Sequence, residues 1–456
     1  MILMKNKLTV ATITGVTAFT LAFCGSAFAQ SSDALIDKLV EKGILSVKEA
    51  TELREETDKG FTQSYAVKSG MPEWVNSLKF NGDLRLRFDS IYNDDPTFID
   101  RDRFRYRMRF GATAMLANNF EAGLRLISGE NAKGGFTSID PISGNASFED
   151  NASKKIIGLD LAYLKWSPIN TPDWSATSIG GKMENPFIFS DIVFDPDYTP
   201  EGFAQQIGYN INDSHAAKLN LGGFILDEIS RSSSDPFLLG SQLRLESTWS
   251  PKWQTSFGLS ALMISGTENL TSANVPDQNK GNTRVNINAG TTNKPSYGPL
   301  ANTFNPIVVD GAVIYSLESF PTYTGAFPIR LAADYVNNPA AHNNNQAFSA
   351  GITFGKSGKK GTWDLTYKYK YLESDSWFEE LVDSDTGAFY KTGIPQSGGG
   401  TGYGAGTNLR GHYLRAAYSP YDFFTFSANY FLFDVIQGRS KNSESGRVQV
   451  DATVKF

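Results

Sequence analysis

The sequence predicts an all-β fold: a transmembrane antiparallel β-barrel of about 16 strands with a short N-terminal helical prefix. Three observations predict it: strands that alternate between apolar and polar residues, connections that alternate between short and long, and a final strand that ends in Phe456. Mean hydropathy is only −0.29, and no apolar run of about 18 residues follows the first thirty. This argues against a helical membrane span, whereas barrel strands give only a weak hydropathy signal.

Residues 1–29 are expected to form a secretory signal peptide. A basic start precedes the apolar stretch Leu8 to Phe23, and Ala27-Phe28-Ala29 is an A-x-A cleavage site. The single cysteine, Cys24, lies inside this segment, so no disulfide, thiolate metal site or catalytic thiol is expected in the mature chain. The formal net charge of −6 argues against a nucleic-acid partner.

Residues 30–77 are predicted to form a periplasmic helical prefix and a linker. Ser32 can cap a first helix that stops near Gly43, and Ser46 with Glu49 makes the capping box of a second helix. The pair is too short to form a core alone. Two roles stay open for it: a module for self-association or cell-wall contact, and a mobile prefix packed against the base of the barrel.

Residues 78–456 are predicted to form the barrel. Most of its strand-like segments are near the ~9–11 residues that a tilted membrane strand needs. In order, they include residues 78–89, 103–114, 120–129, 156–166, 176–183, 216–226, 238–249, 253–263, 312–320, 326–336, 348–354, 363–371, 409–418, 424–433 and 447–456.

The connections between these segments alternate in length. Short turns are expected at residues 115–118, at Pro168, at residues 212–214, at Pro251 and Pro321, at residues 355–361 and at Pro420. Long loops are expected at residues 91–101, 130–153, 184–201, 265–306 and 375–407. Outer-membrane barrels have this asymmetry, with short periplasmic turns and longer extracellular loops, whereas a soluble β-sandwich has no reason for it.

The first two strands carry arginines on one face. Both alternate strictly, and their polar faces hold Arg85, Arg87, Arg103, Arg105, Arg107 and Arg109. An arginine on the lipid face costs ~2–4 kcal/mol at the bilayer midplane. Several of them would outweigh a typical net stability of ~5–15 kcal/mol. We therefore predict that these arginines line a watery lumen.

The arginine face has two interpretations. As an electropositive wall it would favour anions, as rings of Arg or Lys do in anion pores. Alternatively, acidic side chains on inward-folded loops pair with the arginines and leave little selectivity. The candidate for such a constriction loop holds Glu184, Asp191, Asp195, Asp197 and Glu201. The alternatives for this segment are a solvated extracellular loop and a loose cation site.

Aromatic residues mark several strand ends. Trp166-Ser167-Pro168, Trp249-Ser250-Pro251 and Tyr418-Ser419-Pro420 share a pattern that predicts a headgroup-level aromatic followed by a turn. The last strand alternates toward a C-terminal aromatic, Phe456, which is similar to the signal read by the outer-membrane barrel-assembly machinery.

Several motifs occur in a specific order along nearly the whole mature chain. They are the helical prefix at residues 35–54 and the segments 82–88, 102–111, 157–163, 181–187 and 195–202. With them the chain resembles the putative porin family of Gram-negative bacteria. The resemblance implies an outer-membrane channel of porin type, and it carries over neither catalytic residues nor a known solute.

An enzyme is not expected. His215, His342 and His412 are far apart in sequence and lack metal-ligand spacing, so neither a metal site nor a cofactor is predicted. No nucleophile elbow or phosphate-binding Gly-rich loop is present. A hydrolase that uses His412 and a strand-borne serine stays an alternative, and the prefix is too short for the plug of a TonB-dependent transporter.

The function expected from the sequence is passive diffusion of small hydrophilic solutes across the outer membrane, with a preference for anions as a hypothesis. The expected partners are outer-membrane lipid, the barrel-assembly machinery and the solutes, and a homotrimer is an expectation from general porins. The alternative is a binding or adhesion protein whose loops at residues 265–306 and 375–407 meet an extracellular partner.

Overall fold

The computed structural model describes residues 71–131, 137–138, 142–149, 151, 154–230, 232–271, 275, 279–288, 290, 297–390, 402–438 and 443–456. The chain divides into two units, Met1–Pro72 and Glu73–Phe456, and the following concerns the second. The predicted signal peptide and the predicted prefix helices lie outside the described residues.

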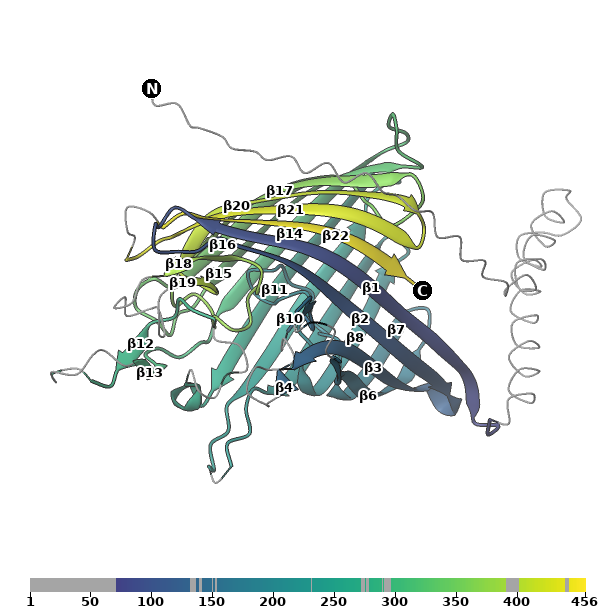
Figure 1. Ribbon diagram of the computed structural model, residues 1–456. Helices are drawn as coiled ribbons and strands as arrows, with labels where there is room; N and C mark the ends of the chain where they lie inside the picture. The colour runs from purple at the N-terminus through teal and green to yellow at the C-terminus, as the bar shows by residue number, and fades with distance from the viewer. Residues whose placement is uncertain are drawn as a thin grey trace, which may run out of the picture. The chain divides into compact units, whose positions relative to one another are not determined.

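Sixteen strands of the second unit form a closed antiparallel β-barrel, as the sequence predicts (Figure 1). Each pairs with the next along the chain, and the first pairs with the last, with Asp83 opposite Lys455 and Asn93 opposite Ser445. The strands are β1 (Val75–Asn93), β2 (Arg101–Leu116), β3 (Phe120–Asn131), β6 (Ile156–Asn170), β7 (Trp174–Lys182), β8 (Glu201–Asn212), β9 (His215–Ile225), β10 (Phe237–Thr248), β11 (Trp253–Ser265), β14 (Ile307–Leu317), β15 (Phe327–Asn337), β16 (Gln346–Gly355), β17 (Thr362–Leu372), β20 (Leu409–Tyr421), β21 (Phe424–Val435) and β22 (Ser445–Lys455).

Short elements lie in the connections. They are β4 (Thr137–Ser138), β5 (Ala146–Ser147), β12 (Arg284–Asn286), β13 (Tyr297–Leu300), β18 (Gly387–Tyr390) and β19 (Gly402–Ala405), with the 3-10 helices η1 (Ala117–Asn119) and η2 (Thr267–Asn269). The pairs β12–β13 and β18–β19 are separate two-stranded sheets. Within the described residues, no helix is long and apolar enough to span a membrane.

The connections separate into two kinds, one at each end of the barrel. At the end that we call the turn end, they cover residues 117–119, 171–173, 213–214, 249–252, 318–326, 356–361 and 422–423. At the opposite loop end, they cover residues 94–100, 132–155, 183–200, 226–236, 266–306, 338–345, 373–408 and 436–444. The predicted asymmetry is thus present. The first loop is shorter than predicted because β1 and β2 both extend further than expected.

Two of the three aromatic-Ser-Pro segments do not form the predicted turns. Only Trp249-Ser250-Pro251 lies in a turn. Trp166-Ser167-Pro168 lies inside β6 and Tyr418-Ser419-Pro420 inside β20, and the strand register shifts at each. A bulge leaves one residue unpaired, so proline, which lacks a backbone N–H, is tolerated there and the strand continues. The three aromatic rings are exposed, as expected of residues at the headgroup level.

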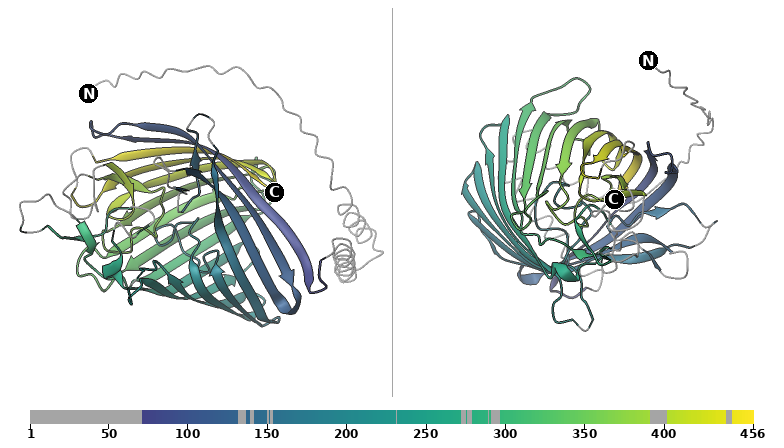
Figure 2. Two further views of the ribbon diagram at one scale, coloured as in Figure 1. Left: turned by 60° about the horizontal axis from the view of Figure 1, so that its bottom comes forward. Right: turned by 90° about the vertical axis from the view of Figure 1, so that its left-hand side faces the viewer.

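An apolar core lies in the loop half of the barrel interior. Inward-facing residues of the strands, such as Phe224, Leu238 and Phe433, pack there with Phe194 and Trp377 from two loops. Figure 2 (right) shows loop segments lying within the ring of strands. Because full burial of a large apolar side chain contributes about 1.5–3 kcal/mol, this core holds the loops inside the barrel.

The seam between β1 and β22 is extended by Phe456. Its backbone N–H donates to the Gly82 oxygen (3.0 Å), and the Gly82 N–H donates to the Phe456 oxygen (2.8 Å). A Cβ on Gly82 would lie 2.7 Å from the Phe456 ring and 2.5 Å from the Arg109 carbonyl oxygen. Only glycine therefore fits at this position of the seam.

We predict that Gly82→Ala destabilises the barrel by about 1–3 kcal/mol, because the added methyl group overpacks the seam. The free energy of unfolding of the refolded protein in urea measures the effect. Gly311→Ala is the matched control, since a Cβ there meets only the Ser256 oxygen at 3.6 Å, an ordinary contact. Equal stability of the two variants would contradict the prediction.

Candidate functional site

The arginine-rich faces of β1 and β2 lie inside the barrel. In the register of the two strands, Arg85 lies opposite Arg107 and Arg87 lies opposite Arg105. Like charges directly opposite each other destabilise a sheet. These two pairs therefore depend on carboxylates or polar groups from other parts of the chain.

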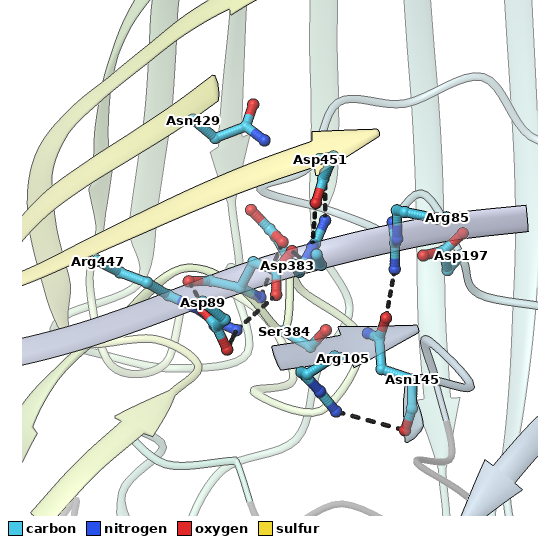
Figure 3. A network of polar contacts seen from close by, with 12 residues as sticks. Arg85, Asp89, Arg105, Asn145, Asp197, Asp383, Ser384, Asn429, Arg447 and Asp451 are labelled. Carbon is cyan, nitrogen blue, oxygen red and sulfur yellow. Dashed lines mark hydrogen bonds and ion pairs between the residues drawn. The ribbon is translucent and has the colours of Figure 1, made fainter. Parts of the chain in front are cut away.

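Carboxylates on the strands supply part of the compensation. Arg87 forms two parallel hydrogen bonds to Asp451 of β22, at 2.7 and 2.9 Å. Asp89, which is fully buried, accepts a hydrogen bond from Arg103 at 2.6 Å. It accepts another from Arg447 at 2.7 Å (Figure 3). Hydrogen bonds between charged groups, such as these, are about twice as strong as hydrogen bonds between neutral groups.

Carboxylates on two loops also compensate the charge of the arginines. We call residues 183–200 inner loop 1 and residues 373–408 inner loop 2. Asp197 of inner loop 1 lies 2.7 Å from Arg107 and 3.4 Å from Arg109. Asp385 of inner loop 2 lies 3.2 Å from Arg87 and 3.1 Å from Arg447. The arginine face therefore holds both inner loops against the wall.

Arg85 and Arg105 meet a neutral partner. The Asn145 side chain accepts a hydrogen bond from Arg85 at 2.7 Å, and the Asn145 backbone oxygen lies 3.5 Å from Arg105 (Figure 3). Asn145 is fully buried next to β5, which pairs with β2 at Arg105. All six predicted arginines are thus inside the barrel, and their lining of a solute pathway stays a prediction.

The predicted constriction residues occupy different positions. Asp191, Asp195 and Asp197 point into the barrel interior, where Asp191 lies 2.9 Å from both Lys368 and Lys370 of β17. Glu184 lies near the start of inner loop 1 and Glu201 is the first residue of β8, with side chains 61% and 65% exposed. They pair with Arg125 and Lys182, respectively, on the strand wall.

The two inner loops are bound to each other by backbone and side-chain hydrogen bonds. The Asp195 N–H donates to the Leu381 oxygen (2.8 Å), and the Asp383 N–H donates to the Asp191 oxygen (3.0 Å). The buried Trp377 indole donates to the Val193 oxygen at 2.8 Å. The loops therefore form one layer across the lumen.

Lys370 of β17 binds both inner loops, and it is not among the site residues predicted from the sequence. It is almost fully buried and lies 2.9 Å from Asp191 and 3.0 Å from Asp383, one from each inner loop. The alternation from Tyr367 to Tyr371 was an available signal, because it places Lys368 and Lys370 on the face opposite the tyrosines.

A third loop, residues 266–306, is bound to inner loop 2. Arg284 and Glu379 form an ion pair at 2.5 Å, and both side chains are at most 2% exposed. Asn282 donates to the Trp377 oxygen at 2.8 Å, and its own N–H donates to Glu379 at 2.6 Å. The two loops predicted for extracellular binding are therefore bound to each other, and most residues at 375–390 are buried.

Two of the cavities lined by described residues lie in the lumen, on the side away from the arginine face. One of about 300 Å³ lies between inner loop 1 and the wall formed by β10 and β14 to β17. The other, of about 560 Å³, lies at the turn end beside Glu246 and Ile314. Among the described residues, no group of three or more His, Cys, Asp or Glu side chains could hold a metal ion.

Comparison with known proteins gives one family match. A family model described as putative porin matches residues 90–456. No protein with a curated description matches the sequence.

Several solved structures of bacterial outer-membrane proteins are similar at low identity. The high-pH structure of OprB from Pseudomonas putida is 12% identical, with 88% of this chain and 97% of that chain covered and a TM-score of 0.48. The outer-membrane channel DcaP of Acinetobacter baumannii is 11% identical, with coverage of 83% and 97% and a TM-score of 0.42. OccK8 (OprE) of Pseudomonas aeruginosa is 9% identical, with coverage of 84% and 100% and a TM-score of 0.41.

Asp197→Ala is predicted to loosen inner loop 1, because Arg107 and Arg109 keep their charges inside the barrel and lose a carboxylate. We expect the free energy that holds inner loop 1 against the wall to fall by about 1–3 kcal/mol. This is less than for a fully buried ion pair, because the Asp197 side chain is partly exposed. The rate of proteolytic cleavage within inner loop 1 measures this effect, and the variant should be cleaved faster than the wild type. Glu201→Gln, at an exposed pair worth about 0–1 kcal/mol, should leave the rate near that of the wild type.

The stability of the contact between inner loops 1 and 2 is also predicted to depend on pH. Burial next to Asp383 and Asp197 raises the pKa of Asp195 to about 8. The folded state thus retains a proton that the unfolded chain loses near pH 4. The stability of the folded state should therefore fall as the pH rises from about 4 to 8. Near pH 8 the Asp195 carboxyl group loses its proton and becomes negatively charged between the two inner loops.

Hydrogen-exchange protection factors of the inner-loop amides, corrected for intrinsic rates, measure this dependence. We expect them to fall between pH 6 and pH 9, and Asp195→Asn, which keeps an acceptor oxygen but cannot ionise, should give a flatter profile. The same slope in wild type and variant would rule out Asp195 as the cause.

Proposed function

Because this chain belongs to the putative porin family, we propose that it is a passive channel for small hydrophilic solutes in the outer membrane. The observation that carries the proposal is a closed barrel whose interior holds charged side chains and two cavities. Lumen-facing charge is expected where water fills the interior, since a charged side chain on the lipid face is costly.

We assign the turn end to the periplasm and the loop end to the outside, following the asymmetry of outer-membrane barrels. Inner loops 1 and 2 then lie between the outside and the lumen. They narrow the channel because they are bound to each other and to both walls, through Lys370 on one side and the arginines on the other. Such a constriction favours solutes over macromolecules.

A modest preference for anions is the second part of the proposal. Arginine outnumbers lysine and histidine along β1 and β2, which makes this wall electropositive before its partners are counted. The pairing with Asp83, Asp89, Asp197, Asp385 and Asp451 weakens that field. We therefore expect a weak selectivity.

Assembly adds two partners to the proposal. Phe456 is the residue we expect the barrel-assembly machinery to bind, and a homotrimer is the oligomer we expect. The mass of the protein in detergent, measured by light scattering with the detergent contribution subtracted, tests the oligomeric state. The adhesion alternative has less support, since most described residues of the loop at 375–407 are buried.

Planar-bilayer recordings test the channel itself. Under a KCl gradient we expect discrete conductance steps and a reversal potential on the side of chloride preference. Liposome swelling with sized sugars should give rates that fall with solute size. A protein that is folded but does not conduct would favour the adhesion alternative, and a preference for potassium would overturn the anion part of the proposal.

A further inference from the structure

The geometry points to a specific solute passage, along the wall of β14 to β17, in which Arg330 binds the carboxylate group of passing solutes. This inference rests on the proposed channel function and identifies where in the lumen the solutes pass. It separates the passage from the arginine face of β1 and β2, which lies on another part of the barrel wall.

Apart from Arg330 and Lys368, the wall of β15 to β17 carries short side chains where it borders the cavity. Ala332 lies opposite Gly351, and Thr353 lies opposite both Arg330 and Thr366. All five residues border the cavity of about 300 Å³. On the facing side of that cavity lies inner loop 1, with Ile188 to Asp191 and Pro196. The lumen therefore stays open here because the wall carries little bulk.

Arg330 differs from the other charged groups of this cavity. Arg244 pairs with Asp310 at 2.8 Å, Lys368 pairs with Asp191 at 2.9 Å, and Asp334 accepts a hydrogen bond from Ser349 at 2.6 Å. Arg330 is exposed and forms no ion pair with any residue in the described parts of the chain. Its guanidinium group is available to a solute.

Arg330 borders one of the two cavities and lies next to the other. In the strand register it lies opposite Ile314 of β14, which borders the turn-end cavity of about 560 Å³. Arg330 itself borders the cavity beneath inner loop 1. A solute that moves from one cavity to the other along this wall therefore passes the guanidinium group.

A carboxylate is the chemical group that best fits this site. The planar guanidinium can form two parallel hydrogen bonds to its two oxygens. The hydroxyl groups of Thr353 and Thr366, 3.0 Å apart, are close enough in register to contact the rest of a hydrophilic solute. The arginine face of β1 and β2 is less suited. Its four arginines in ion pairs, Arg87, Arg103, Arg107 and Arg109, are only 4–22% exposed. Arg85 and Arg105 contact Asn145.

Charge selection is tested with two Arg→Gln variants. Arg330→Gln should lower the chloride-to-potassium permeability ratio and weaken the block of chloride current by benzoate about threefold to tenfold, as expected for loss of a charge-assisted contact in water. The control is Arg410→Gln, which removes the same charge from an exposed position at the loop end of β20. Equal benzoate block in Arg330→Gln and wild type would overturn the role of Arg330.

The passage is tested with adjacent alanines on opposite faces of β15. Ala332→Trp should reduce single-channel conductance by more than half, whereas Ala333→Trp, which faces outward beside Leu331 and Ala350, should conduct like the wild type. If Ala332→Trp does not fold, Ala332→Cys replaces it, since Cys24 is the only other cysteine in the sequence. A negatively charged thiosulfonate reagent should then reduce its conductance.

Failure of the proposed channel function and failure of this inference would give different results. A wild-type protein that folds but does not conduct contradicts the channel function. A wild-type protein that conducts, together with Ala332 variants that conduct unchanged after substitution or labelling, shows that solutes pass elsewhere and overturns only this inference.

Discussion

The contact on which the rest of the structure depends is the one between the arginines of β1 and β2 and the carboxylates that reach them. Two arginine pairs lie directly opposite each other in the register, where like charges repel. Asp451 and Asp83 on strands, and Asp197 and Asp385 on loops, offset that repulsion. The inner loops are therefore inside the barrel for electrostatic reasons as well as apolar ones, and wall and loops stabilise each other.

Much of the fold could be predicted because membrane strands obey a simple period. Alternation identifies which side chains face lipid, and the cost of charge in lipid then identifies the interior face. The aromatic-Ser-Pro segments show the limit of this reasoning. Trp166 and Tyr418 are exposed as predicted, but they do not end their strands, because bulges let β6 and β20 continue. These bulges depend on pairing with the neighbouring strand, which local sequence does not reveal.

The partners within the site could not be predicted, because they are distant in sequence. Arg107 and Asp197 are 90 residues apart, and Arg87 and Asp451 are 364 apart. Inner loop 2 was predicted only as a long loop, although Trp377-Phe378 and Leu381-Val382 within it are apolar pairs that indicate burial. The wall around Ala332 and Gly351 is harder still to recognise, since small side chains leave no pattern in a sequence.

The seam between β1 and β22 also constrains the order of folding. Arg87 reaches a carboxylate of the last strand, and Asp89 beside it receives Arg447 from that same strand. Neither group has its final partners until the C-terminal strand has been synthesised and paired. Bringing together segments this far apart in sequence is slow, because a large loop must be closed before the contact is gained. The first strand of the barrel is thus completed last.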